Sequence, residues 1–240
     1  MRRREPDFGH DGWKARDDLF SAEQNAVVVR DAEQYYQQMY AGGESTWNLR
    51  DGHMAQTLRS LVDHLTALSG RPAKVVVWEH NSHVGDARAT PMGARGQVTV
   101  GQLVRERVGA DAFLVGLTPD EGEVTAAPDW GRPTHRWRVR PALRGSHEEL
   151  LHDVALPRYW LDTADPDVRK VLGEMRLERA IGVVYRPVHE RQSHYFLAHL
   201  ADQFNAVIHL DRTRALRPLE REATWLHGEP DPPETFPSGF

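Results

Sequence analysis

The chain has 240 residues, 40% hydrophobic and 27% charged, a balance typical of one globular α/β domain with a sizeable core. Its net charge of −5 gives no broad positive field, so no nucleic-acid partner is expected. The absence of cysteine excludes disulfides and thiolate metal sites, and no apolar run approaches the ~20 residues that a membrane span needs. The N-terminus is basic without an apolar core behind it, so we expect a cytoplasmic protein with no membrane partner.

The first half of the chain predicts two helices and a strand after an irregular N-terminal segment, residues 1–18. Apolar residues recur at helical spacing over 18–40 and again over 50–68, where Gly70 and Pro72 stop the second helix. Residues 75–78 then form a continuous Val-Val-Val-Trp run. Such a run is typical of a strand buried on both faces of a parallel sheet.

Helices and strands alternate in the second half. Thr99 predicts the N-cap of a helix ending near Gly109, and Ser146 and Glu149 fit a capping box for a helix that reaches about residue 154. The predicted strands cover residues 112–117, 122–127, 136–141, 180–185 and 206–210. Residues 220–240 contain several prolines and predict a disordered tail.

This order of elements predicts an α/β fold whose central, mostly parallel sheet is flanked by helices. The domain is expected to span residues 19–219. Two helices precede the first predicted strand without strand partners, and a sheet built from this chain alone would expose edges. We therefore expect an incomplete domain that lacks an N-terminal half.

A cluster of polar residues follows the predicted strand 75–78. Glu79, His80, Asn81 and His83 come directly after its carboxyl end, the edge where open α/β sheets bind ligands. Two residues three apart in an extended chain lie on opposite faces, so the imidazoles converge only if the chain turns at 81–82, as asparagine and serine favour. His80 and His83 are therefore candidates for proton transfer or for stabilising an oxyanion. The alternative is a pair of capping or solvated histidines.

Four further side chains are candidates for binding substrate. Glu79 could orient a histidine or remain a surface charge, and Asn81 could donate to an oxyanion or simply cap the turn. Arg50, at the start of the second helix, could bind a carboxylate or phosphate. His194 follows the tip of the predicted strand 180–185 and could line the same cleft.

Other chemistries receive less support from the sequence. Glu79, His80, His83 and Asp86 offer nitrogen and oxygen ligands, so a metal-dependent hydrolase is an alternative, but the zinc-helix pattern of two histidines four apart is absent. We predict no metal and no cofactor. No glycine-rich phosphate loop follows a strand and no Gly-X-Ser-X-Gly elbow occurs, which disfavours nucleotide use and serine hydrolase chemistry.

An ordered series of motifs between residues 20 and 219 resembles the erythromycin esterase family. The matching pieces are Tyr35-Tyr36, Trp47-Asn48-Leu49-Arg50-Asp51-Gly52-His53-Met54, Val77-Trp78-Glu79-His80-Asn81-Ser82-His83-Val84-Gly85-Asp86, Met92-Gly93, Val100-Gly101-Gln102-Leu103, Arg138-Val139-Arg140-Pro141-Ala142, Ile181-Gly182-Val183-Val184-Tyr185-Arg186, Gln192-Ser193-His194-Tyr195 and Phe204-Asn205-Ala206-Val207-Ile208-His209. The resemblance implies an α/β fold with a cleft, in which histidine-activated water cleaves a small ester or lactone without a covalent intermediate.

The resemblance also implies that His80 and His83 form this chain's part of the cleft. In the family, the general base lies with a glutamate in a Gly-Glu-X-X-His-Gly type motif in the N-terminal half. Residues 43–47 begin similarly but have no histidine at the needed position, so the chain matches the C-terminal half. The implied partners are a separate N-terminal half or a second copy. The alternative is a truncated, inactive homologue that binds a ligand or partner.

Overall fold

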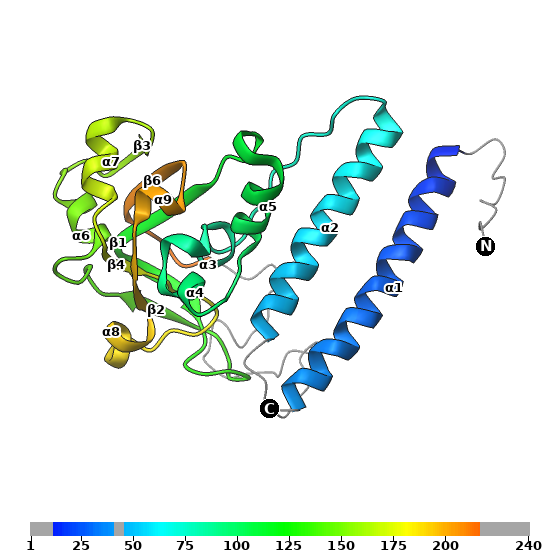
Figure 1. Ribbon diagram of the computed structural model, residues 1–240. Helices are drawn as coiled ribbons and strands as arrows, with labels where there is room; N and C mark the ends of the chain where they lie inside the picture. Colours follow the sequence, from blue (N-terminus) through cyan, green and yellow to red (C-terminus); the bar gives the residue numbers. More distant parts are fainter. Residues whose placement is uncertain (1–11, 41–45, 217–240) are drawn as a thin grey trace. The chain divides into compact units, whose positions relative to one another are not determined.

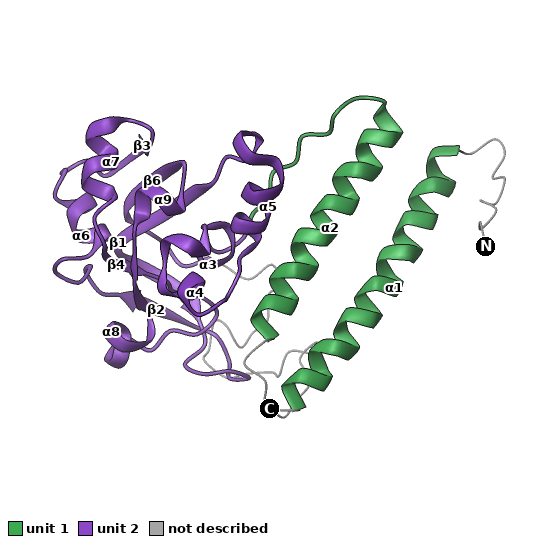
Figure 2. Cartoon of the chain, viewed as in Figure 1, with its two compact units in different colours: residues 1–78 green, residues 79–240 purple. Residues whose placement is uncertain are grey.

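The computed structural model describes residues 12–40 and 46–216, which divide into two compact units, residues 1–78 and 79–240 (Figure 2). The expected tail, residues 220–240, and the Gly-Glu piece at 43–45 lie outside the described residues.

The first unit is a hairpin of two long helices, α1 (Gly12–Tyr40) and α2 (Thr46–Ser69) (Figure 1). Both predicted helices are confirmed, but α1 begins earlier than expected, so residues 12–18 are helical rather than irregular. Two histidines of α2 join the helices: His53 Nδ1 lies 2.7 Å from Asp31 Oδ2, and His64 Nε2 lies 2.7 Å from Asp17 Oδ1. Asp17 therefore has a partner that holds this first part of α1 in place.

The predicted buried strand at residues 75–78 is wrong. The segment is neither helix nor strand and pairs with no strand among the described residues, and Val76 and Trp78 are 91% and 84% exposed. An apolar run predicts burial only if neighbouring strands are present to cover it. Within the described parts of this chain, no strand forms hydrogen bonds of a sheet with residues 75–78.

The second unit contains two sheets. The larger has the strand order β2-β1-β6-β3, where β1 (Val115–Ala126) pairs in parallel with β6 (Ala206–Arg212). The outer strands β2 (His135–Val139) and β3 (Arg158–Asp162) are antiparallel to their neighbours. The smaller sheet pairs β4 (Arg176–Arg179) with β5 (Tyr195–Ala198).

The α/β prediction, with a sheet flanked by helices, is confirmed, while the pairing within that sheet is mixed rather than mostly parallel. The strand predicted at residues 180–185 is misplaced. β4 ends at Arg179, and the following segment makes only an isolated bridge between Val184 and Ala127. The strand instead ends with two charged residues, Glu178 and Arg179, whose side chains are buried. Charged residues normally predict exposure, so their polarity does not indicate this burial.

Short helices surround the sheets (Figure 1). They are α3 (Asn81–Val84), α4 (Pro91–Ala94), α5 (Val100–Val108), α6 (His147–His152), α7 (Pro166–Leu172), α8 (Glu190–Ser193) and α9 (Leu200–Gln203), with 3-10 turns at η1 (Ala87–Ala89), η2 (Gly109–Asp111) and η3 (Pro187–His189). Both predicted caps are confirmed: Thr99 accepts from Gln102 N–H, and Ser146 accepts from Glu149 N–H. Each such cap contributes about 1 kcal/mol to stability.

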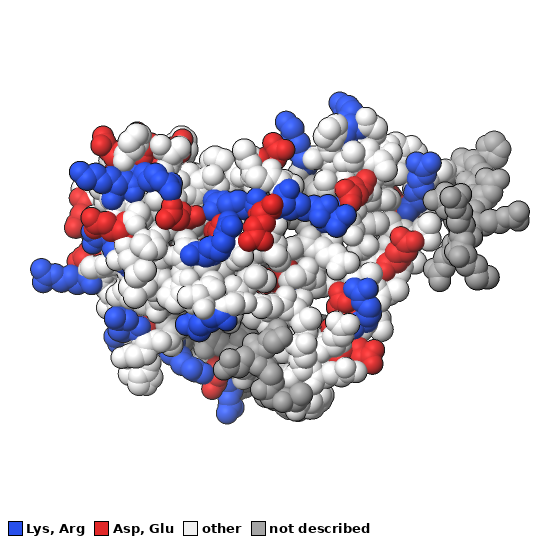
Figure 3. Space-filling model, viewed as in Figure 1, with Lys and Arg blue, Asp and Glu red and all other residues white. Residues whose placement is uncertain are grey.

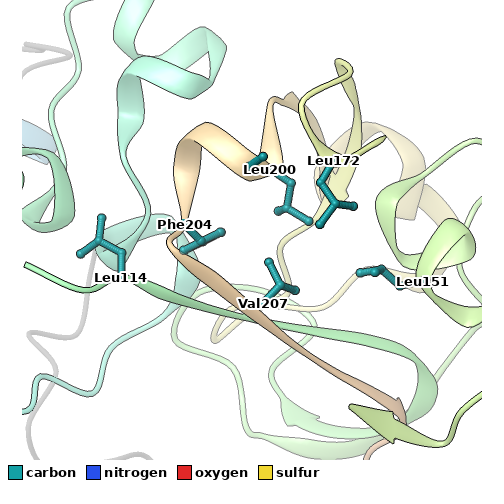
Figure 4. Close-up of a cluster of buried hydrophobic side chains, with 7 residues drawn as sticks. Leu114, Leu151, Leu172, Leu200, Phe204 and Val207 are labelled. Atoms are coloured by element: carbon teal, nitrogen blue, oxygen red, sulfur yellow. The ribbon is translucent and has the colours of Figure 1, made fainter. Parts of the chain in front are cut away.

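The core lies between the larger sheet and α6, α7 and α9 (Figure 4). It comprises Leu114, Leu151, Leu172, Leu200, Ala201, Phe204 and Val207. Each fully buried leucine contributes roughly 1.5–3 kcal/mol through burial of apolar surface. Val84, the last residue of α3, packs against this cluster and so ties the predicted site segment to the core.

The surface carries both signs of charge. On the face shown in Figure 3, lysine and arginine side chains are interspersed with aspartate and glutamate. No helix within residues 12–40 or 46–216 is long and apolar enough to cross a membrane.

Candidate functional site

The turn on which the predicted site depends is present. His80 stands at the N-cap of α3, and its carbonyl accepts from His83 N–H at 2.8 Å and from Val84 N–H at 3.1 Å. The chain thus reverses at residues 81–82 and brings His80 and His83 to the same turn. A charge on His83 is near enough to lower the pKa of His80.

Both ring nitrogens of His80 are engaged. Nδ1 accepts from the backbone N–H of Ser82 at 3.2 Å and lies 2.8 Å from its hydroxyl. A backbone N–H can only donate, so Nδ1 carries no proton, and Nε2–H donates to the carbonyl of Ile181 at 3.0 Å. Burial, more than the other causes, lowers the pKa of His80. The neutral ring therefore joins α3 to the segment that follows β4.

The side chain of Asn81, which lies in this turn, forms hydrogen bonds with the backbone of β1. Its Nδ2 donates to the carbonyl of Leu117 at 2.9 Å, and its Oδ1 accepts from the Leu117 N–H at 3.0 Å. The carboxamide thus makes the pair of bonds that a neighbouring strand would make with β1. Both its donor and its acceptor group are engaged with β1 rather than with the turn itself, so neither the capping of the turn nor a bond to an oxyanion is what these contacts show. Glu79, just before α3, is partly buried.

His194 meets the same segment from the other side. Its Nε2 accepts from Arg186 N–H at 2.8 Å, so its Nδ1–H donates to the carbonyl of Ala180 at 3.2 Å. Because His80 donates to the next carbonyl, Ile181, the two histidines hold adjacent peptides. Burial lowers the pKa of His194, whose ring packs at 5.3 Å from that of Tyr185. His80 and His194 therefore bind adjacent carbonyls of one segment, both as neutral rings.

Arg50 lies in the first unit, apart from the unit that contains the other predicted site residues. Its side chain is exposed, and the guanidinium carbon stands 5.3 Å from the centre of the Trp47 ring. A cation over an indole is held by about 0.5–1 kcal/mol at an exposed site. The structure gives Arg50 this local partner and leaves its role in substrate binding a prediction.

A group of buried charged residues that no sequence pattern reveals lies in the second unit, close to α3. Glu148 and Glu178 are 0% exposed, and Arg179 is nearly so. The Arg179 guanidinium donates to the carbonyls of Asp120 at 2.6 Å and Arg140 at 3.0 Å, and it lies 3.2 Å from Glu190. The capping box at Ser146 predicts that Glu148 lies in a helix. Glu178 and Arg179 lie in a short strand, and nothing in the local sequence predicts that charged residues there are buried.

A surface hollow of about 460 Å³ in the second unit is not lined by His80 or His83. Half of its lining residues are arginines and aspartates, several of which pair with each other, such as Arg105 with Asp86 at 3.0 Å. In the ranges that the structure describes, no three histidine, aspartate or glutamate side chains gather as metal ligands would.

Comparison with known proteins gives a family match. Residues 1–213 match the family model described as erythromycin esterase. A crystal structure of a protein from Bacillus cereus is similar with a TM-score of 0.58 at 17% identity, over 70% of this chain and 39% of that one. A succinoglycan biosynthesis protein is similar with a TM-score of 0.51 at 20% identity, over 84% and 51% of the respective chains.

A third solved structure is a histidine-to-asparagine mutant of the erythromycin esterase EreC in its open conformation, with a TM-score of 0.49 at 20% identity, over 75% of this chain and 41% of that one. At these identities the likeness of the first two structures shows the fold alone. The chain spans about half, or less, of the length of the solved structures it matches.

Proposed function

Because the chain belongs to the erythromycin esterase family, we propose that it supplies one side of the cleft of a hydrolase that cleaves an ester or lactone with histidine-activated water. The substrate is a small molecule, and a macrolide lactone is one member of that class. The base that activates the water comes from a segment outside this chain, because no Gly-Glu-X-X-His-Gly motif occurs in it.

The observation that supports the proposal is the α3 turn, which contains both His80 and His83, and to these two residues we assign different roles. His80 is neutral, and its two nitrogens join Ser82 to Ile181, so it acts as a positioning residue. His83, one turn further on, is the group that exchanges a proton with the reacting oxygen or stabilises its charge. Asn81 supports both by its bonds to Leu117.

The order of proton transfer follows from these roles. Water attacks the carbonyl carbon while the base removes its proton, and charge develops on the carbonyl oxygen. An imidazole at His83 donates a hydrogen bond to that oxygen or a proton to the leaving alkoxide. The products are an acid and an alcohol, or a hydroxy acid when the substrate is a lactone.

Hydrolysis of a panel of esters and lactones, including a macrolide, tests the proposal. The chain is assayed alone and together with the N-terminal half of a homologous family member. We expect turnover in the mixture and none with the chain alone. Turnover by the chain alone would show that a histidine within it is the base. The absence of hydrolysis in both assays would overturn the proposal and favour a ligand- or partner-binding module.

A further inference from the structure

Two fully buried glutamates lie behind the α3 turn. Glu148 comes from α6 and Glu178 from β4, and a bridge between Ser146 and Leu177 brings the start of α6 against that strand. Both side chains are 0% exposed. Two interacting carboxylates that are both buried in a low-dielectric interior cannot both keep a full charge without a large energetic cost.

Around this pair, buried hydrogen-bond acceptors outnumber the donors that are placed to bond to them. Glu148 Oε1 accepts from the Arg179 N–H at 2.8 Å. The other Glu148 oxygen, both Glu178 oxygens and Gln203 Oε1 are buried without a well-aligned hydrogen bond, and the only donors among the described residues that act on the Glu178 carboxyl are the side-chain amides of Gln203 and Asn81. A proton on one carboxyl converts an acceptor into a donor and removes part of this shortage. Burial raises the pKa of both acids, and the charge of Glu148 raises that of Glu178 further.

The pair is joined to the site through two side-chain amides. Gln203 and Asn81 act on Glu178 and lower its pKa, so both lie near its carboxyl group. Gln203 also packs against the end of the turn: a Cβ on Gly85 would stand 2.6 Å from Gln203 Nε2, and the Gln203 carbonyl accepts from Asp86 N–H at 3.1 Å. The acid thus lies directly behind the segment that carries His80 and His83.

We propose that Glu148 and Glu178 share one buried proton at neutral pH, and that Glu178 is a positioning residue that holds the α3 turn through Asn81 and Gln203. The titratable and charged groups that act on the pair include Arg179, whose charge lowers the pKa of Glu148, and Tyr195, whose own pKa is raised in part by the charge of Glu148. The importance of this pair for catalysis rests on the function proposed above. The shared proton and the positioning of the turn do not depend on that function, so each can be tested without a substrate.

Infrared spectroscopy of the full chain at pH 7 tests the proton. We expect a carbonyl stretch from protonated carboxyl groups, which Glu178→Gln reduces and Glu174→Gln leaves unchanged. Glu174 lies near the start of the same strand with a side chain 62% exposed, so it is a matched glutamate outside the interior. A band of equal intensity in wild type and Glu178→Gln, or no band in either, would overturn the shared proton.

Amide hydrogen exchange tests the positioning. The Leu117 N–H is bonded to Asn81, so its exchange reports whether the turn stays on β1. In Glu178→Leu we expect this amide to exchange at least tenfold faster relative to the amide of Ile208 on β6, whereas Glu178→Gln keeps the wild-type ratio. An unchanged ratio in Glu178→Leu would refute the positioning role. If that variant does not fold, Glu178→Ala replaces it under the same criterion, and the infrared result on Glu178→Gln still decides the proton.

Discussion

The side chain of Asn81 and the backbone of Leu117 form two hydrogen bonds, at 2.9 and 3.0 Å, in the manner of two paired strand residues. Leu117 pairs on its other side with Ile208 of β6, while β2 pairs with β1 only from Gly122 onward. One carboxamide thus attaches the site segment to the edge of the first half of β1. The position of both histidines depends on this attachment.

Replacing Asn81 with alanine removes both bonds and leaves the Leu117 amide and carbonyl without them. We expect the free energy of unfolding to fall by about 1–3 kcal/mol, the range for unsatisfied buried polar groups. Chemical denaturation of wild type, Asn81→Ala and Asn25→Ala measures this. Asn25 is exposed on α1, so its variant should stay within about 0.5 kcal/mol of wild type. Equal effects of the two substitutions would contradict the role given to Asn81.

The close approach of α5 to α3 predicts a second pair of variants. A Cβ on Gly101 would overlap the carbonyl oxygen of Val84 and lie 2.6 Å from its carbon, whereas a Cβ on Gly52 would meet nothing within 4 Å. Gly101→Ala should therefore destabilise the protein by at least about 2 kcal/mol, as overpacking does. Gly52→Ala lies in a helix with free space and should stabilise it by about 0.5–1 kcal/mol. Thermal unfolding of both variants compares the signs directly.

His147 predicts a loss of stability in acid. It is fully buried, Nε2 bonds to the carbonyl of Ala198 at 3.0 Å, and burial lowers its pKa to about 4. The unfolded chain takes up this proton near pH ~6.5 and the folded chain only near pH 4, so the contribution is complete above ~6.5 and is lost as the pH falls toward 4.

The expected loss is on the order of 3 kcal/mol, from about 1.4 kcal/mol per pKa unit. The free energy of unfolding of His147→Gln, measured between pH 7 and 4, should decrease less steeply than that of wild type. His189→Gln, on the surface, is the control and should follow the wild-type curve. Parallel curves for wild type and His147→Gln would show that this histidine is not held neutral.

The sequence predicts the helices and their caps well because those signals are local. Thr99 and Ser146 bond to amides three residues away, so the spacing alone locates both helix starts. The turn at residues 81–82 is likewise predicted locally, by the Asn-Ser dipeptide. Residues 75–78 fail for the opposite reason: burial of Val76 and Trp78 requires neighbouring strands, which a local pattern cannot supply.

The candidate site divides in the same way. Spacing finds His80 and His83, but the bonds of His80 to Ile181 and of His194 to Ala180 join segments that are 101 and 14 residues apart in the chain. Glu178 escapes prediction because its burial depends on Glu148 and Gln203, which come from other elements. Tertiary contacts of this kind decide which polar side chain becomes part of a site and which stays in solvent.

The division of labour between the two histidines is the central claim, and the value of kcat/KM for His83→Asn tests it most directly. The substitution is assayed on the best ester or lactone of the panel, in the mixture with the N-terminal half, beside His189→Asn as an exposed control. We predict a loss of 10²-fold or more for His83→Asn, the range for a group that transfers a proton in the transition state, and none for the control. Wild-type turnover by His83→Asn would contradict the account.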